Sequence, residues 1–169
     1  MPARTNILKT LVALALLCLL QAGCGYKLAS DEPSVLGSGE KTVKIKRVEN
    51  PTLYPWLSPQ IRTIVHDEVN YRKLGRWVDS GEADYELDVE VTRFRVSDHG
   101  YSREGTSVMY SASMTMIISV YDGSTNKLVW SSGRIDLSRV YDTDSAQAAA
   151  LELSRELVRR GMDRMRFAF

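Results

Sequence analysis

Apolar and polar residues alternate in several stretches of this 169-residue chain, and each stretch predicts a half-buried β-strand. Residues 42–48 alternate apolar with basic side chains. Residues 85–91 alternate more regularly, but the next apolar residues are Phe94 and Val96, so the pattern shifts by one position after Val91. A shift of this kind predicts a β-bulge or a sharp bend at that point.

The second half of the chain predicts two more strands. A polar turn over residues 97–105 precedes a long alternating stretch, residues 107–121, whose length suits a central place in a sheet. Residues 122–126, Asp-Gly-Ser-Thr-Asn, are typical of a hairpin loop. Residues 127–141 are the last predicted strand, and Gly133 in its middle predicts a bend or a bulge.

The first predicted helix covers residues 59–74, where apolar residues recur at helical spacing. Ser58 followed by Pro59 is typical of an N-cap and a first helical position. Gly75 is the predicted C-terminal stop.

The second predicted helix runs from Ala146 to about Arg166. Asp144 and Gln147 resemble a capping box, with Asp in place of the usual Ser or Thr. Gly161 costs about 1 kcal/mol relative to Ala in a helix interior. We therefore expect Gly161 to allow close packing of this helix on the sheet.

The predicted elements follow the order strand, helix, strand, strand, strand, helix. Short turns join the last three strands into an antiparallel meander, whereas the helix after the first strand allows that strand to pair in parallel. We expect an α+β two-layer sandwich, with a four-stranded mixed sheet and two helices on one face (β-α-β-β-β-α). This domain covers residues 41–169, and the sequence shows no internal repeat.

The N-terminus follows a different pattern, which is typical of a bacterial lipoprotein signal peptide over residues 1–23. Arg4 and Lys9 supply the positive charge at its start, and no acidic residue precedes Asp31. Residues 11–20 are an apolar stretch, too short to span a bilayer, which needs ~20 residues.

Cys24 is the predicted lipidation site, since the small residues Ala22 and Gly23 precede it. Gln21 departs from the usual motif, in which Leu stands three residues before the cysteine. The alternative is an ordinary secretory signal that leaves Cys24 as a free thiol, although a single unpaired thiol is unusual in an oxidising compartment. Gly25, rather than Asp, favours export to the outer membrane, a rule that depends on the species.

Composition narrows the function classes for the part after the signal. The signal takes two of the 22 basic residues and none of the 21 acidic ones, which leaves a net charge of −1. A near-neutral chain shows no bias toward nucleic acid. Cys24 is the only cysteine after residue 23, so we expect no internal disulfide and no cysteine metal site. The sequence also lacks a nucleophile elbow, a zinc motif and a phosphate loop, so we expect no enzymatic activity and no cofactor.

Residues 24–40 are expected to form a lipidated N-terminus and a lead-in to the domain. The run of residues 23–28, Gly-Cys-Gly-Tyr-Lys-Leu, the order of the elements, and the strand over residues 110–121 with its Asp122-Gly123 turn together resemble the LPS-assembly lipoprotein LptE family. The resemblance covers nearly the whole chain after the signal.

This resemblance implies a lipid-anchored protein on the periplasmic face of the outer membrane. Its partner would be an LptD-like β-barrel, which it plugs and helps to assemble, and it would take part in the delivery of lipopolysaccharide to the cell surface. The alternative function is that of an auxiliary lipoprotein in an ABC-type lipid transport system.

The resemblance makes Arg103 the first candidate for contact with lipopolysaccharide, because Arg103-Glu104-Gly105 matches a basic, polar, Gly turn of the family. A guanidinium binds lipid A phosphate through paired charged hydrogen bonds. The alternative is a solvated loop arginine, and Glu104 weakens the local positive charge. The family's second basic position has no match, since Asp142 and Asp144 stand in that region.

Two further groups of basic residues have two interpretations each. Lys44 and Lys46, with the neighbouring Arg47, form either a phosphate-binding patch or an ordinary solvated strand face. Five arginines crowd the last predicted helix: Arg155, Arg159, Arg160, Arg164 and Arg166. Cations near a helix C-terminus are favoured by the helix dipole, and their alternative role is contact with the barrel wall or with anionic lipid.

Overall fold

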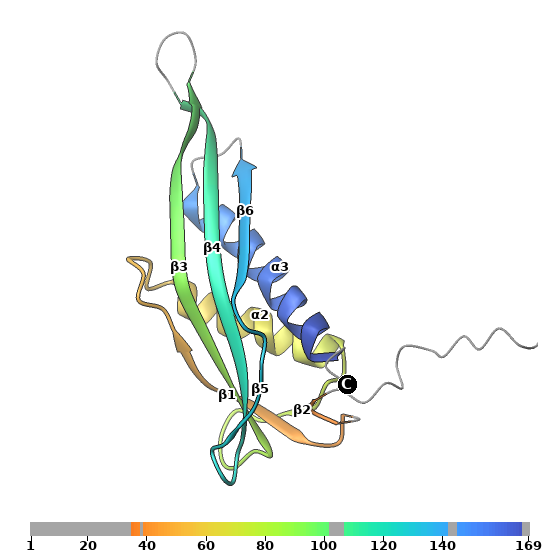
Figure 1. Cartoon of the computed structure of the whole chain (residues 1–169). Coiled ribbons are helices and arrows are strands. Elements are labelled where there is room, and N and C mark those ends of the chain that lie inside the picture. The colour runs from red at the N-terminus through yellow and green to blue at the C-terminus, as the bar shows by residue number, and fades with distance from the viewer. Residues whose placement is uncertain (1–34, 38, 102–106, 142–144, 167–169) are drawn as a thin grey trace, which may run out of the picture. The chain divides into compact units, whose positions relative to one another are not determined.

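The computed structural model describes residues 35–37, 39–101, 107–141 and 145–166. In these ranges the elements are β1 (Thr42–Glu49), α2 (Leu57–Tyr71), β2 (Arg76–Trp77), β3 (Tyr85–Tyr101), β4 (Ser107–Asp122), β5 (Leu128–Ser131), β6 (Ile135–Tyr141) and α3 (Ala146–Arg166). They form a mixed sheet with both helices on one of its faces (Figure 1). The structure confirms the predicted α+β class and two-layer arrangement.

The sheet of the described part has six strands where the sequence predicts four. Its order is β2-β1-β3-β4-β5, and β6 also pairs with β4. β1 runs parallel to β2 and β3, while β3, β5 and β6 run antiparallel to β4. β4 is therefore the central strand, as its length predicts, with partners along both of its edges.

The predicted strand over residues 127–141 is divided into β5 and β6. Gly133 lies between them with a φ of 61°, in the left-handed region that favours glycine, and turns the chain. Ser132 keeps this break attached to β4, since its N–H donates to the Ile118 carbonyl at 2.8 Å and its hydroxyl accepts from the Ile118 N–H at 3.0 Å. The bend predicted at Gly133 is thus large enough to separate two strands.

The bulge predicted after Val91 is confirmed, because the β3–β4 register shifts between Val91 and Arg93. β3 then continues to Tyr101, so the part of the predicted turn before residue 102 is strand instead. Ser97 pairs with Ser111 in this region. Backbone pairing with β4 extends the strand even though its side chains there are polar.

A second bulge lies in β1, between Ile45 and Arg47. Lys46 is the extra residue on this strand, since Ile45 pairs with Leu87 and Arg47 pairs with Asp88. The bulge places two successive cations outside and returns Val48 to the apolar side of the strand.

α2 begins and ends differently from the prediction. Trp56, rather than Ser58, is its N-cap residue, without a side-chain hydrogen bond. The Leu57 N–H donates to the Tyr54 carbonyl at 3.0 Å and starts the helix one residue before Ser58. Lys73 takes the left-handed position after the helix, with a φ of 53°, and so replaces the predicted stop at Gly75.

Gly75 is required for another reason. A Cβ at this position would lie 2.4 Å from the Val43 Cγ2 atom and 2.9 Å from the Lys41 carbonyl oxygen. The chain can therefore pass close to β1 on its way into β2 only where a side chain is missing.

α3 has the predicted bounds, but the described part of its N-terminus is capped by Ser145. The Ala148 N–H donates to the Ser145 hydroxyl at 3.2 Å, and Asp144 lies outside the described residues. The expectation for Gly161 is confirmed, because a Cβ there would lie 2.5 Å from the Ile118 Cδ1 atom.

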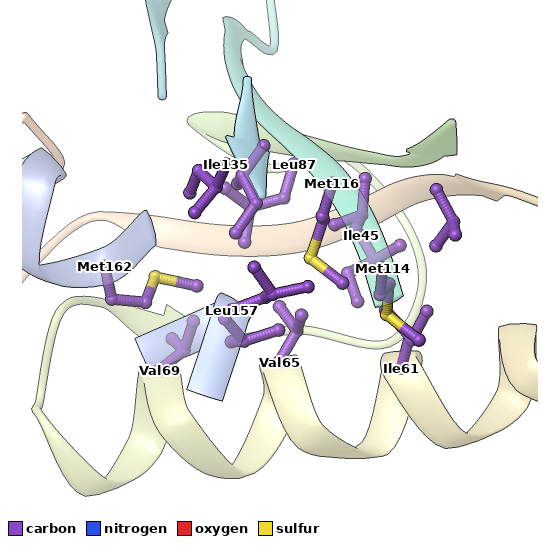
Figure 2. Close-up of a cluster of buried hydrophobic side chains, with 14 of the residues drawn as sticks. Ile45, Ile61, Val65, Val69, Leu87, Met114, Met116, Ile135, Leu157 and Met162 are labelled. Atoms are coloured by element: carbon purple, nitrogen blue, oxygen red, sulfur yellow. The ribbon is translucent and has the colours of Figure 1, made fainter. Parts of the chain in front are cut away.

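The hydrophobic core lies between the sheet and the two helices (Figure 2). The strands contribute Ile45, Leu87, Met114, Met116 and Ile135, and the helices contribute Ile61, Val65, Val69, Leu157 and Met162. Burial of each such side chain stabilises the fold by roughly 1.5–3 kcal/mol. Neither helix of the described part is long and apolar enough to cross a membrane.

Candidate functional site

α2 and α3 cover one face of the sheet, and no described element covers the other (Figure 1). We call this second side the open sheet face. Its side chains come from the outward positions of four strands: Lys44, Lys46, Arg47, Glu86, Asp88, Glu90, Thr115, Ile117, Ser119, Tyr121, Asp136 and Ser138. Apolar residues fill the inward positions, so the burial of the core orients this mostly polar set toward the outside.

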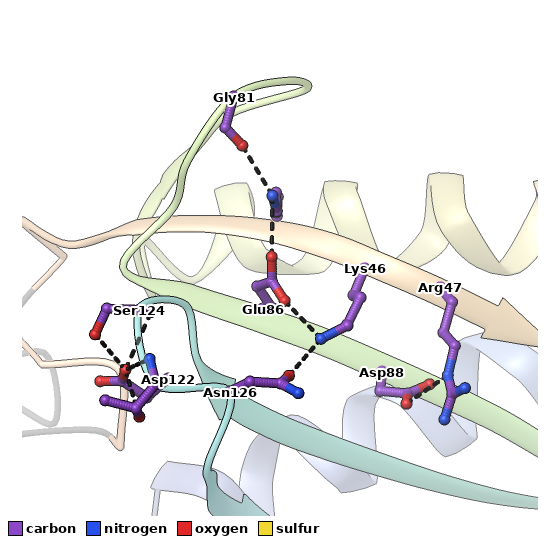
Figure 3. A network of polar contacts seen from close by, with 10 residues as sticks. Lys46, Arg47, Gly81, Glu86, Asp88, Asp122, Ser124 and Asn126 are labelled. Carbon is purple, nitrogen blue, oxygen red and sulfur yellow. Dashed lines mark hydrogen bonds and ion pairs between the residues drawn. The ribbon is translucent and has the colours of Figure 1, made fainter.

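Glu86 joins two cations of β1 (Figure 3). Its two carboxylate oxygens lie 3.0 Å from the Nζ atoms of Lys44 and Lys46. The Glu86 side chain is only 14% exposed. Hydrogen bonds from Lys46 and Lys44 lower the pKa of Glu86, so this carboxylate is ionised at neutral pH.

Each lysine has one further partner. The Lys44 Nζ atom donates to the Gly81 carbonyl oxygen at 2.8 Å, and the Lys46 Nζ atom donates to Asn126 Oδ1 at 2.5 Å. The Lys46 ammonium also lies 5.6 Å from the centre of the Tyr121 ring. These contacts fix both lysines on the sheet and connect them to two loops.

Arg47 forms a separate ion pair in the next row of the sheet. Its Nε atom donates to Asp88 Oδ2 at 2.7 Å, and its Nη1 atom lies 2.7 Å from Glu49. The hydrogen bond to Asp88 raises the pKa of Arg47. Asp88 Oδ1 is buried and has no hydrogen-bond partner among the described residues, so one acceptor of this pair remains open.

The loop that carries Asn126 is held by Asp122. The hydroxyl of Ser124 and the backbone N–H of Thr125 donate to Asp122 Oδ1 at 2.7 Å each (Figure 3). The Ser124 hydroxyl and the Thr125 N–H and hydroxyl lower the pKa of Asp122 to about 2. The predicted hairpin loop is therefore a rigid turn that presents Asn126 to Lys46.

A polar contact also joins β4 to β6 on the open sheet face. The Thr115 hydroxyl donates to Asp136 Oδ1 at 2.7 Å, across the β4–β6 pair. This bond lowers the pKa of Asp136, with a smaller contribution from Arg134. Polar contacts therefore extend from β1 to β6.

This arrangement suits recognition rather than acid–base chemistry. Three cations of β1 face two carboxylates of β3, Glu86 and Asp88, and the ion pairs between them neutralise most of the charge. A carboxylate with a lowered pKa is a poor general acid at neutral pH. Within the described ranges, no group of three His, Cys, Asp or Glu residues is placed to hold a metal ion.

A cavity of about 280 Å³ lies beside Lys44, between α2 and the first two strands. Its walls are Lys44, Ile45, Arg62, Thr63, His66, Trp77, Val78 and Asp79. The Trp77 ring meets the edge of His66 at a centroid distance of 4.9 Å, and its Nε1 atom donates to Asp79 at 2.8 Å. Trp77 also packs partly against the core.

The predicted site residues do not all come together. Lys44 and Lys46 meet on Glu86, which takes up charge that a phosphate would need, so a phosphate patch at these lysines stays a prediction. Cys24 and Arg103 lie outside the described residues. Sequence reasoning missed Asn126, because nothing in a turn sequence shows that its amide reaches a lysine on β1.

No protein-family model matches the sequence, and no curated protein matches it significantly. Similar solved structures include the PelC dodecamer from Paraburkholderia phytofirmans, which is 15% identical with a TM-score of 0.49 over 73% of this chain and 90% of that one.

Two other similar structures are lipoproteins. Rare lipoprotein B from Shewanella oneidensis is 16% identical, with a TM-score of 0.40 over 73% of this chain and 89% of that one. Lipoprotein B from Nitrosomonas europaea is 15% identical, with a TM-score of 0.47 over 82% of each chain. Similarity at this level assigns neither a family nor a function.

Proposed function

We propose that this protein is an outer-membrane lipoprotein, anchored through Cys24, that partners an LptD-like β-barrel. It would help to assemble and plug the barrel and take part in the delivery of lipopolysaccharide. The anchor is supported by the signal-peptide pattern over residues 1–23 and the cysteine that follows it.

The observation that carries the partnership is the open sheet face. It is mostly polar, with Ile117 as an apolar member, and its cross-strand ion pairs join three cations to two carboxylates. A barrel lumen is lined by polar side chains, and a mostly polar sheet surface with paired charges is compatible with such a lining.

Site-specific photocrosslinking tests the partnership in the intact outer membrane. A photoreactive amino acid replaces Ser138, which is exposed on the open sheet face, or Arg160, which is exposed on α3 as the matched control. We expect Ser138 to yield an adduct with a large outer-membrane β-barrel, and Arg160 to yield none. An adduct from Arg160 alone would contradict the proposed surface. Adducts with inner-membrane transporter components would instead favour the ABC-type alternative.

Arg103 remains the proposed lipopolysaccharide contact, in the segment between the end of β3 and the start of β4. Arg103→Glu should weaken lipopolysaccharide binding, because the guanidinium that would bind lipid A phosphate is replaced by a carboxylate. Association with the barrel should survive. Equal lipopolysaccharide binding by the variant and the unmodified protein would reject this role.

A further inference from the structure

α2 and α3 leave a groove of about 300 Å³ between them. Its walls are Gln60, Thr63, Ile64, Asp67 and Glu68 of α2, and Leu151, Arg155 and Arg159 of α3. Arg72, which directly follows α2, binds Glu68 of α2 and Asp163 of α3, at 2.5 Å each. This link joins the two helices near their C-terminal ends, and the groove volume reaches the lower limit of small-molecule sites.

The arginines of α3 are not equivalent in the structure. Arg160 pairs with Glu156 at 2.9 Å, and Arg164 donates to the Ser132 carbonyl oxygen at 2.8 Å. Arg155 and Arg159, by contrast, make no hydrogen bond or ion pair with any other described residue. The unneutralised positive charge of α3 therefore includes two side chains of the groove.

The helix dipole does not account for these two residues. Its effect is limited to the last turn, where the basic residues of α3 are Arg164 and Arg166. Arg155 and Arg159 lie further back and are four positions apart, so they are neighbours on the same helix face and repel each other. An anion between them would remove that repulsion.

The carboxylates of the opposite wall do not serve as this anion. Glu68 is bound by Arg72, and Asp67 lies 3.0 Å from the His66 Nδ1 atom. Both acidic groups of the groove therefore have cationic or polar partners on α2 or directly after it.

The remaining walls add an apolar surface and a free acceptor. Ile64 packs against the core, and Leu151 is half-buried. Gln60 Oε1 is buried and has no hydrogen-bond partner within the described part of the chain. A buried acceptor in this state is unusual and would be satisfied by a hydroxyl or an N–H.

We propose that the groove between α2 and α3 binds a small anionic amphiphile. Its carboxylate or phosphate lies between Arg155 and Arg159, its apolar part lies on Ile64 and Leu151, and a hydroxyl or N–H close to its head group donates to Gln60. The site belongs to the helix layer, so it goes beyond the β-barrel partnership and does not depend on it.

Isothermal titration calorimetry tests this site on the chain from residue 24 onward, produced without lipid, which contains the whole core. Dodecanoate and dodecyl phosphate, below their micelle concentrations, are the probes. We expect one bound molecule per chain, and the tighter of the two probes identifies the head group. Dodecyl maltoside, with the same tail and no charge, should not bind measurably.

Two sets of variants distinguish binding in the groove from nonspecific attraction to the positive charge of α3. Arg155→Gln with Arg159→Gln should weaken binding by about tenfold for each arginine, since each loses a charge-assisted hydrogen bond. Arg160→Gln removes the same charge from α3 outside the groove and should bind as the unmodified chain does. Leu151→Gln should also weaken binding, through loss of the apolar surface.

Several results would overturn the site. The first is that neither anionic probe binds. The second is that the double variant binds the probes as tightly as the unmodified chain, and the third is that Arg160→Gln weakens binding as much as the double variant does. Binding of inorganic phosphate as tightly as dodecyl phosphate would also overturn it, because the apolar wall would then contribute nothing.

Discussion

Glu86 shows how a single carboxylate organises the open sheet face. It binds Lys44 and Lys46, the residues before and after Ile45 in β1, and its own side chain is mostly buried beneath them. The two lysines also reach Gly81 and Asn126. One residue of β3 thus holds β1 and, through its lysines, two loops.

Glu86→Gln should destabilise the protein by about 1 kcal/mol at neutral pH, because two charge-assisted bonds are lost at a partly exposed site. The folded-state pKa of Glu86 is lowered, so its contribution is present above the unfolded pKa and is lost as the pH falls through the folded pKa. Urea unfolding at pH 7 and at pH 2.5 measures this difference.

The control for this experiment is Glu82→Gln, since Glu82 is exposed and has no ion pair with another described residue. We expect it to leave the free energy of unfolding nearly unchanged at both pH values. A loss for Glu86→Gln that persists at pH 2.5 would mean that shape, rather than charge, explains the effect.

Gly161 sets the distance between α3 and the sheet at the scale of elements. Gly161→Ala gains about 1 kcal/mol of helix propensity. It also forces a methyl group against Ile118, and such overpacking costs roughly 1–3 kcal/mol. We expect a net destabilisation of about 1 kcal/mol. Ile118→Val removes the contacting Cδ1 atom, so the double variant should be more stable than the sum of the single effects predicts.

Chemical denaturation of the two single variants and the double variant measures this coupling, which we expect to be about 1 kcal/mol. Ile118→Val combined with Ser145→Ala is the control, because Ser145 caps the distant end of α3. Additive effects in the Gly161–Ile118 pair would show that α3 moves away from the sheet instead of overlapping with it.

The elements that could be predicted from the sequence are those with a clear periodicity. The shift after Val91 predicts the bulge, because successive side chains in a strand point to opposite faces and a shift in the pattern therefore requires an extra residue. β2 could not be predicted, because its two residues, Arg76 and Trp77, are too short for any period. The helix stop at Lys73 was missed because backbone hydrogen bonds hold a non-glycine residue in the left-handed region.

The same reasoning limits what sequence shows about sites. The lysines of β1 could be predicted to face outward, but their shared partner depends on the β1–β3 register. The groove between α2 and α3 joins residues that lie far apart in the sequence, such as Gln60 and Leu151. Only the folded structure shows that Arg155 and Arg159 lack a partner among the described residues, whereas Arg160 and Arg164 have one.

At the scale of the whole molecule, β4 is the strand on which the sheet is built. It pairs with β3 along one edge and with β5 and β6 along the other. No described strand pairs with β3 beyond Glu90 on the edge away from β4. Native-state hydrogen exchange should therefore be slowest in the middle of β4.

Along β3 after Glu90, we expect alternate amides to exchange faster, because those that do not donate to β4 face the free edge. Two-dimensional NMR of the deuterated protein measures both strands in one experiment. Uniform protection along this part of β3 would show that another segment pairs with the edge.

The extra residue in β1 has a consequence for changes in chain length. A one-residue deletion in a strand normally turns every later side chain to the opposite face. Lys46 is the residue that β1 has in excess over β3, so its deletion would leave Ile45 and Val48 facing the core and Lys44 and Arg47 facing out. The sheet can lose this position and keep its register, and a chain without Lys46 should fold with only the Lys46 contacts to Glu86, Asn126 and Tyr121 missing.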